Sequence, residues 1–178
     1  MTNQEPVGRA GTGVAERERP RPPGGGDGTM LQAAHYALLC TRLAEDAGRF
    51  DGPRHLAEAA EDAFYRELDW LCRERDATGR AQRLAVARRY WRDAGMGSVD
   101  FADAGEAGLT AVMPRSLVDA GWLDRWGRRA TPGNHLGRGF VAAVAAICNG
   151  TPPRFFAVTE PRSLACGDEA SEFRAVPR

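Results

Sequence analysis

The apolar residues in the first half of the chain recur every three to four positions, which is the spacing of helices that bury one face. This pattern predicts helices over 30–47, 53–78 and 80–93. In the first of them, Leu39 and Leu43 widen the apolar face that is expected to be buried. The first half is therefore expected to be helical.

From Gly97 onward the pattern changes to short strands separated by helices. Residues 140–147 are almost all small or apolar, which predicts a central helix that is buried on most sides and that ends at Asn149-Gly150. The predicted elements of this half are strands over 98–102 and 109–113, helices over 116–126 and 136–148, and a closing hairpin with arms over 154–164 and 171–176.

The order of helices, hairpin, helices and hairpin predicts an α+β fold, in which an antiparallel sheet of two hairpins is packed by about five helices. We expect residues 29–178 to form this single domain, with Thr29 capping the first helix. Residues 1–28 are rich in Gly, Pro and Arg and have too few apolar side chains to offset the entropy of ordering, so a disordered tail is expected there.

All 24 basic residues are arginines, and 24 acidic residues balance them. The lack of lysine is typical of a GC-rich genome such as that of an actinobacterium. It excludes Schiff-base chemistry, Walker-A phosphate loops and Ser–Lys dyads, which all need a lysine amine. The balanced charge favours neither nucleic acid nor an anionic membrane as a partner. With no membrane-length apolar run and no secretory signal, the sequence predicts a cytoplasmic chain.

His135 and Arg138 stand at the start of the small-residue helix, where free backbone N–H groups and the helix dipole favour an anion. They are candidates for binding a carboxylate, sulfate or phosphate. The alternative is ordinary capping of the helix by Asn134, without a ligand. Trp122 is a candidate for the wall of a ligand pocket, and packing in the core or at an interface is the alternative.

The last third of the chain carries a motif whose parts follow one another in a recognisable order. These parts are the small-residue helix 136–143, Asn149-Gly150, a strand that reaches Glu160, the Gly167-Asp168 turn, and Phe173. The segment resembles the C-terminal half of the 4-vinyl-reductase domain and, equally, the end of the L-2-amino-thiazoline-4-carboxylic acid hydrolase family. The resemblance implies a scaffold that binds a small molecule.

The chain departs from this resemblance at the residues that would bind a metal. In metal-binding sensors of the vinyl-reductase type, a strand glutamate and cysteines around the turn hold zinc. Glu160 matches that glutamate, but Ser163 and Ser171 occupy the cysteine positions, and Cys166 lies at a different offset. Serine hydroxyls are poor zinc ligands compared with thiolates. We therefore expect neither a metal nor another cofactor.

Two carboxylates are candidates for a catalytic base. Glu67 lies next to Leu68 in an apolar stripe, where burial would raise its pKa, and pairing with an arginine is the alternative. Glu160, without a metal, is expected to pair with Arg162 or Arg138.

Three functions remain open from the sequence. The first is a small-molecule-binding accessory subunit of a bacterial natural-product biosynthetic enzyme, catalytically silent and supporting a homologous partner as a hetero-oligomer, or forming a homodimer. The second is a stand-alone hydrolase or cyclase that acts on an amino-acid-like substrate, by analogy with two-component aziridine-forming enzymes. The third is a ligand-sensing regulatory domain.

Overall fold

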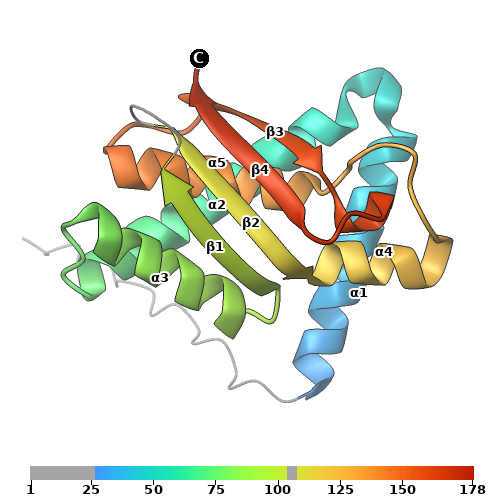
Figure 1. Cartoon of the computed structure of the whole chain (residues 1–178), viewed down its shortest axis with the longest axis horizontal. Helices are drawn as coiled ribbons and strands as arrows, with labels where there is room; N and C mark the ends of the chain where they lie inside the picture. The colour runs from blue at the N-terminus through green and yellow to red at the C-terminus, as the bar shows by residue number, and fades with distance from the viewer. Residues whose placement is uncertain (1–26, 104–107) are drawn as a thin grey trace, which may run out of the picture.

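A computed structural model describes residues 27–103 and 108–178 of the chain (Figure 1). Within these residues there are five α-helices, four strands and two short 3₁₀ helices. The helices are α1 (Asp27–Asp46), η1 (Gly48–Phe50), α2 (Gly52–Glu74), α3 (Arg80–Asp93), α4 (Leu117–Trp126), α5 (His135–Asn149) and η2 (Leu164–Cys166). The strands are β1 (Gly97–Asp103), β2 (Leu109–Ser116), β3 (Phe156–Arg162) and β4 (Ser171–Pro177).

The four strands form one antiparallel sheet in the order β1-β2-β4-β3. The hairpins β1–β2 and β3–β4 join where β2 pairs with β4, with Leu109 opposite Ala175. Figure 1 shows α2 and α5 behind one face of the sheet, α3 beside β1, and α1 and α4 at the other end. The predicted α+β fold, an antiparallel sheet of two hairpins packed by five helices, is confirmed.

The sheet has one buried and one exposed face, because side chains along a strand point alternately to opposite sides. On β2, Leu109, Ala111 and Met113 are fully buried, whereas Val112 and Pro114 are exposed. This alternation directs the apolar row of the central strands toward the helices and leaves the other face to solvent.

Helix α5 is central, as its small and apolar residues predict. Residues 139–147 are all buried. A Cβ atom on Gly139 would lie 2.4 Å from the carbonyl oxygen of Ala57, so the glycine allows α2 and α5 to approach closely. On the α3 side, the ring of Phe140 stacks on that of Trp91 with 4.1 Å between centroids. The α2–α5 contact thus depends on the absence of a side chain at one position.

Most predicted boundaries agree with the structure to within a few residues. The third predicted helix matches α3, Arg80–Asp93. Helix α5 ends at Asn149 and is capped by Gly150, which has the expected left-handed backbone with φ 66°. The first arm of the closing hairpin is shorter than predicted. The register of β3 against β4 becomes irregular between Thr159 and Arg162, where Pro161 has no N–H for the ladder, and η2 follows.

The N-terminal predictions fare differently. The expected tail, 1–28, lies outside the described residues except for Asp27 and Gly28, which begin α1. Thr29 therefore lies within the first turn of α1, and its prediction as the helix cap is wrong. Among the described residues, none of the helices combines the length and apolarity that crossing a membrane requires.

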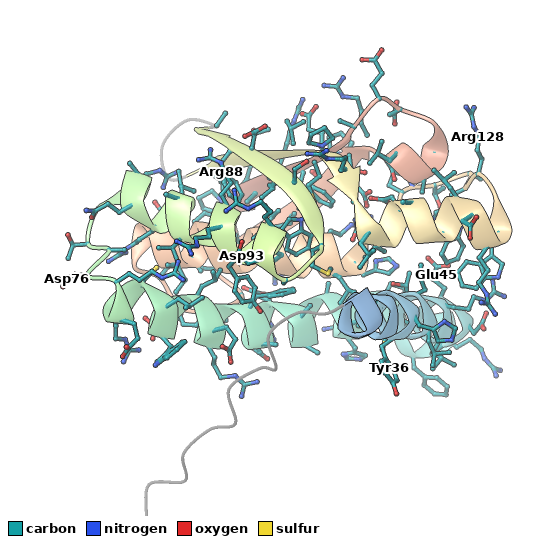
Figure 2. All side chains as sticks on the ribbon, turned by 90° about the horizontal axis from the view of Figure 1, so that it is seen from below. Tyr36, Glu45, Asp76, Arg88, Asp93 and Arg128 are labelled. Carbon is teal, nitrogen blue, oxygen red and sulfur yellow. The ribbon has the colours of Figure 1, made fainter. Side chains whose placement is uncertain are left out.

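The apolar face of α1 is narrower than predicted. Thr41 is fully buried and Leu38 is half-buried, but Leu39 and Leu43 remain 46% and 57% exposed. Tyr36 is 66% exposed and points away from the body of the molecule (Figure 2). Helix α1 contacts chiefly α2 and α4, and neither neighbour covers these three apolar side chains.

Candidate functional site

A network of buried polar groups is centred on Asn134, the N-cap of α5. Its side-chain oxygen accepts a hydrogen bond from the backbone N–H of Gly137 at 2.8 Å. Its side-chain nitrogen donates to Ser116 Oγ at 3.0 Å and to Asp119 Oδ2 at 2.9 Å. Its backbone N–H donates to Glu160 Oε2 at 3.0 Å. Asn134 therefore caps α5, which is the alternative to anion binding at this helix start. It also links α4, α5 and β3.

The two serines at the closing hairpin have different surroundings. Ser171 Oγ donates to Asp119 Oδ2 at 3.0 Å and accepts from the backbone N–H of Leu164 at 2.9 Å. Ser163 is fully buried, and its backbone N–H donates to Asp168 Oδ2 at 2.7 Å, but its hydroxyl has no hydrogen-bond partner. Ser171 thus connects the turn to α4 by hydrogen bonds, whereas the Ser163 hydroxyl is buried without a hydrogen bond.

This arrangement does not fit a zinc ion. Within the described residues, no three side chains of His, Cys, Asp or Glu come together as metal ligands. Ser171 Oγ is already committed to two hydrogen bonds. Burial raises the pKa of the nearby Cys166 thiol, which disfavours the thiolate that zinc needs.

Glu160 is buried at the irregular end of β3. Its Oε2 accepts the hydrogen bond from Asn134, and its Oε1 has no partner. Burial raises the pKa of Glu160 to about 7, the Asn134 N–H opposes this, and the carboxylate of Asp119 adds to it. The side chain therefore holds a proton near neutral pH more readily than an exposed carboxyl does.

Arg138 is the nearest cation to Glu160, and the geometry decides between its two expected partners. Arg138 Nη2 lies 3.7 Å from Glu160 Oε2, which is an ion pair without a hydrogen bond. Arg162 binds Glu172 instead, through Nε at 2.9 Å. Arg138 Nε is buried and has no hydrogen-bond partner. The predicted pairing of Glu160 is thus realised with Arg138 and only at long range.

His135 is buried at the first position of α5. Its Nε2 lies 3.4 Å from Glu45 Oε1, and Glu45 also pairs with Arg129. Burial, with the positive charge of Arg138, lowers the pKa of His135 to about 4, while Glu45 works against this. The imidazole is therefore neutral at physiological pH, and neither of its ring nitrogens has a hydrogen-bond partner.

Trp122 and Glu67 lie apart from Arg138 and Glu160. Trp122 is buried under Arg129, whose guanidinium carbon is 4.0 Å from the ring centroid, and its other neighbour is Trp126 at 4.5 Å. Glu67 is half-buried on α2, and its charge acts on Tyr90 of α3. Of the sequence candidates, the structure thus brings His135, Arg138 and Glu160 together.

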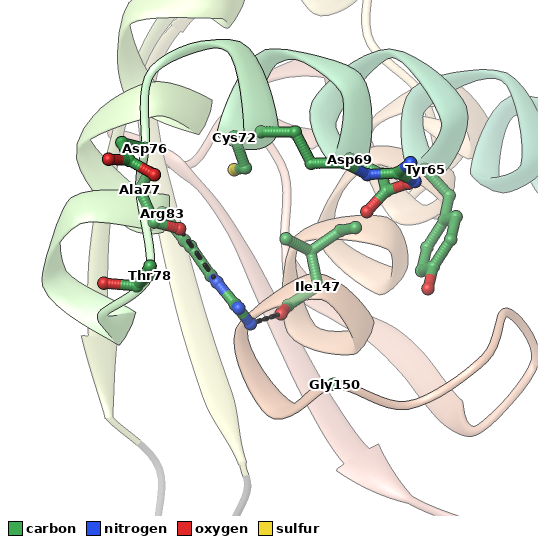
Figure 3. A pocket seen from close by; sticks show the side chains of 10 residues that line it. Tyr65, Asp69, Cys72, Asp76, Ala77, Thr78, Arg83, Ile147 and Gly150 are labelled. Atoms are coloured by element: carbon green, nitrogen blue, oxygen red, sulfur yellow. Dashed lines mark hydrogen bonds and ion pairs between the residues drawn. The ribbon is translucent and has the colours of Figure 1, made fainter.

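A cleft of about 400 Å³ opens where the ends of α2, α3 and α5 meet (Figure 3). Its polar groups are largely paired: Arg83 donates to the carbonyl oxygens of Ile147 at 2.6 Å and Ala77 at 3.3 Å, and Arg73 pairs with Asp69. Among the described residues, none of the buried polar atoms that lack a partner belongs to its lining. No buried polar atom in the described lining of this cleft therefore needs a ligand to complete its hydrogen bonds.

A second cleft, of about 260 Å³, lies between α2, α5 and β3. Its lining includes Arg138, so it reaches the buried pair of Arg138 and Glu160. Apolar side chains make up much of the rest: Pro53, Ala57, Ala142, Phe156 and Val158. This cleft combines apolar and charged walls with a buried polar atom that lacks a partner, Arg138 Nε. An apolar surface with a few polar groups is the usual character of a ligand site.

Sequence reasoning did not select Glu45, Asp119 or Arg129 as site residues. Arg129 reaches Glu45 across 84 positions, and Ser171 reaches Asp119 across 52. No local pattern marks such pairs, because they become neighbours only when α1, α4 and the closing hairpin meet.

No protein-family model and no curated protein matches this chain. Solved structures do match. The phenol-responsive sensory domain of the transcription activator PoxR, with phenol, has a TM-score of 0.65 and 13% identity over 81% of this chain and 73% of that one. A trafficking protein particle complex subunit 3 from Naegleria fowleri, covalently bound to palmitic acid, has a TM-score of 0.54 and 12% identity over 85% and 95%. These similarities establish a shared fold.

Proposed function

We propose that this chain is a small-molecule-binding domain whose ligand lies in the cleft between α2, α5 and β3. The proposal is carried by Arg138, which lines that cleft and whose buried Nε has no hydrogen-bond partner. Leaving such groups unpaired costs free energy, and a polar ligand atom would remove that cost.

The fold neighbours support this proposal. One is a sensory domain with phenol and the other carries palmitic acid, so the same architecture accommodates small molecules in two proteins. The first neighbour belongs to a transcription activator, which favours a ligand-sensing regulatory role among the functions left open by the sequence. Membership of the vinyl-reductase or thiazoline-hydrolase type remains part of the proposal.

The test is a ligand-observed NMR screen of a fragment library against the full chain. Ala57 lines the cleft and Ala59 is exposed on the same helix, so they form a matched pair of positions. We expect Ala57→Leu to lose the hits of the wild type and Ala59→Leu to keep them. Hits that persist equally in both variants would place the ligand elsewhere and contradict the proposal.

A second candidate function is that of an accessory subunit. It is favoured by the exposed apolar side chains of α1 and η1, which are Tyr36, Leu39, Leu43 and Phe50. Exposed apolar side chains gathered in this way are common at protein interfaces. We expect Leu43→Glu to dissociate a homodimer, or a complex with a homologous subunit, in light scattering, and Ala59→Glu to leave it intact. A wild type that stays monomeric and co-purifies with no homologous subunit would argue against this role.

A further inference from the structure

The acidic residues around the cleft are already paired with arginines. Asp51 and Glu58 both bind Arg54, the latter at 2.9 Å. Glu61 is 4% exposed and accepts hydrogen bonds from the backbone N–H and from Nη1 of Arg154, each at 2.7 Å. These carboxylates are therefore neutralised, and they do not attract a cationic ligand to the cleft.

Arg138, in contrast, has no carboxylate of the described residues within hydrogen-bond distance. Its Nη2 makes one long hydrogen bond, 3.4 Å to the carbonyl oxygen of Pro132, and lies 3.7 Å from Glu160 Oε2. Its Nε is buried without a partner. A guanidinium presents its N–H donors as a planar fork that fits a carboxylate with two parallel hydrogen bonds. Arg138, whose side chain is 29% exposed, thus places an incompletely paired guanidinium on the wall of the cleft.

Glu160 lies on the same side of β3 as two residues of the cleft wall. Phe156, Val158 and Glu160 are spaced two apart, so their side chains share one face of the strand. The Glu160 side chain is fully inaccessible to solvent and lies behind Arg138, which lines the cleft. The charged groups that act on it come from two other elements: Arg138 on α5 and Asp119 on α4.

We infer that the cleft binds a small monocarboxylic acid with an apolar body, its carboxylate on Arg138, with the buried carboxyl group of Glu160 behind that arginine. This inference rests on the proposed function and names the class of its ligand. A volume of about 260 Å³ lies just below the usual range for drug-sized ligands of about 300–1,000 Å³, so the body is limited to roughly one ring or a short chain.

Binding of this kind includes the uptake of a proton. The ligand carboxylate and the Glu160 carboxylate would share one cation, Arg138, and the added negative charge favours the protonated form of Glu160. Glu160 therefore takes a proton from solvent when the ligand anion arrives, and the ligand keeps its negative charge opposite Arg138. No covalent bond forms or breaks in the ligand.

The experiment is calorimetric titration of the full chain with benzoate and with benzamide, its neutral analogue of the same shape. We expect benzoate to bind at least about tenfold more tightly than benzamide, the difference typical of a charge-assisted contact. Arg138→Gln should abolish this preference. Arg138→Lys, which keeps the charge without the fork, should reduce it in part, and Arg66→Gln, on the exposed side of α2, should retain it.

Proton uptake is measured by repeating the titration at pH 7.5 in Tris and in HEPES, which differ in ionisation enthalpy. We expect most of one proton to be taken up per benzoate bound, and none in Glu160→Gln. Benzamide binding as tightly as benzoate, an unchanged preference in Arg138→Gln, or no binding of benzoate would each overturn the carboxylate inference. The proposed function is judged separately, because fragment hits sensitive to Ala57→Leu would stand with any other ligand class.

Discussion

Replacing Glu160 with glutamine removes a carboxylate that the fold holds out of water. Burial raises the pKa of Glu160 from its ordinary 4.5 to about 7. At about 1.36 kcal/mol per pH unit, this interval means that the ionised side chain costs the folded state about 3 kcal/mol above pH 7. Glutamine has nearly the same shape and can still accept the hydrogen bond from Asn134, so the substitution isolates the charge.

The sign of the pH dependence follows from the direction of the pKa change. Between pH 4.5 and about 7 the folded chain keeps a proton on Glu160 that the unfolded chain releases. The stability that this group contributes is complete below pH 4.5 and is lost as the pH rises through that window. His135 acts oppositely: its pKa falls from 6.5 to about 4, so its contribution is complete above pH 6.5 and is lost on acidification.

Between pH 4.5 and 6.5 the contributions of Glu160 and His135 to the free energy of unfolding change in opposite directions, so they offset each other in the wild type. Comparison of the wild type with Glu160→Gln isolates the contribution of Glu160. The assay is urea unfolding followed by tryptophan fluorescence, to which the fully buried Trp91 contributes. From about pH 4 to pH 8 we expect the variant to gain about 3 kcal/mol relative to the wild type. Glu169→Gln, in the exposed turn, is the control and should show no such gain. A difference that stays constant over this range would refute the reasoning.

Three further predictions concern packing, hydrogen bonding and metal. Gly139→Ala should lower the free energy of unfolding by about 2 kcal/mol in urea denaturation, because its Cβ would meet a carbonyl oxygen of α2 at 2.4 Å, and Gly48→Ala, in open space, should not. Ser171→Ala should lower the free energy of unfolding by about 1–3 kcal/mol, because it removes two buried hydrogen bonds. Ser163→Ala removes a hydroxyl that has no hydrogen-bond partner, so its free energy of unfolding should stay within about 0.5 kcal/mol of the wild type. Protein purified without chelator should contain far less than stoichiometric zinc by elemental mass spectrometry, and stoichiometric zinc that disappears in Glu160→Ala would contradict this.

The fold class and most element boundaries could be predicted from the sequence alone. Helix α3 and the buried small-residue helix α5 follow from the spacing and size of apolar residues, and so do the two hairpins. These are local properties, because the periods of helix and strand arise from backbone geometry over a few residues. The candidate residues His135, Arg138 and Glu160 were also visible, since helix starts and the family resemblance mark them.

Only the tertiary structure decided which side of α1 is covered and which groups surround Glu160. Leu39 and Leu43 satisfy the helical period but stay exposed, because the neighbours of α1, chiefly α2 and α4, do not cover them. The sequence predicts Asn134 only as a helix cap. In the structure its backbone N–H also donates to Glu160 and its side chain to Asp119, which lie on two other elements. Burial, partners and pKa values depend on which distant segments meet, and short-range periodicity carries no record of that.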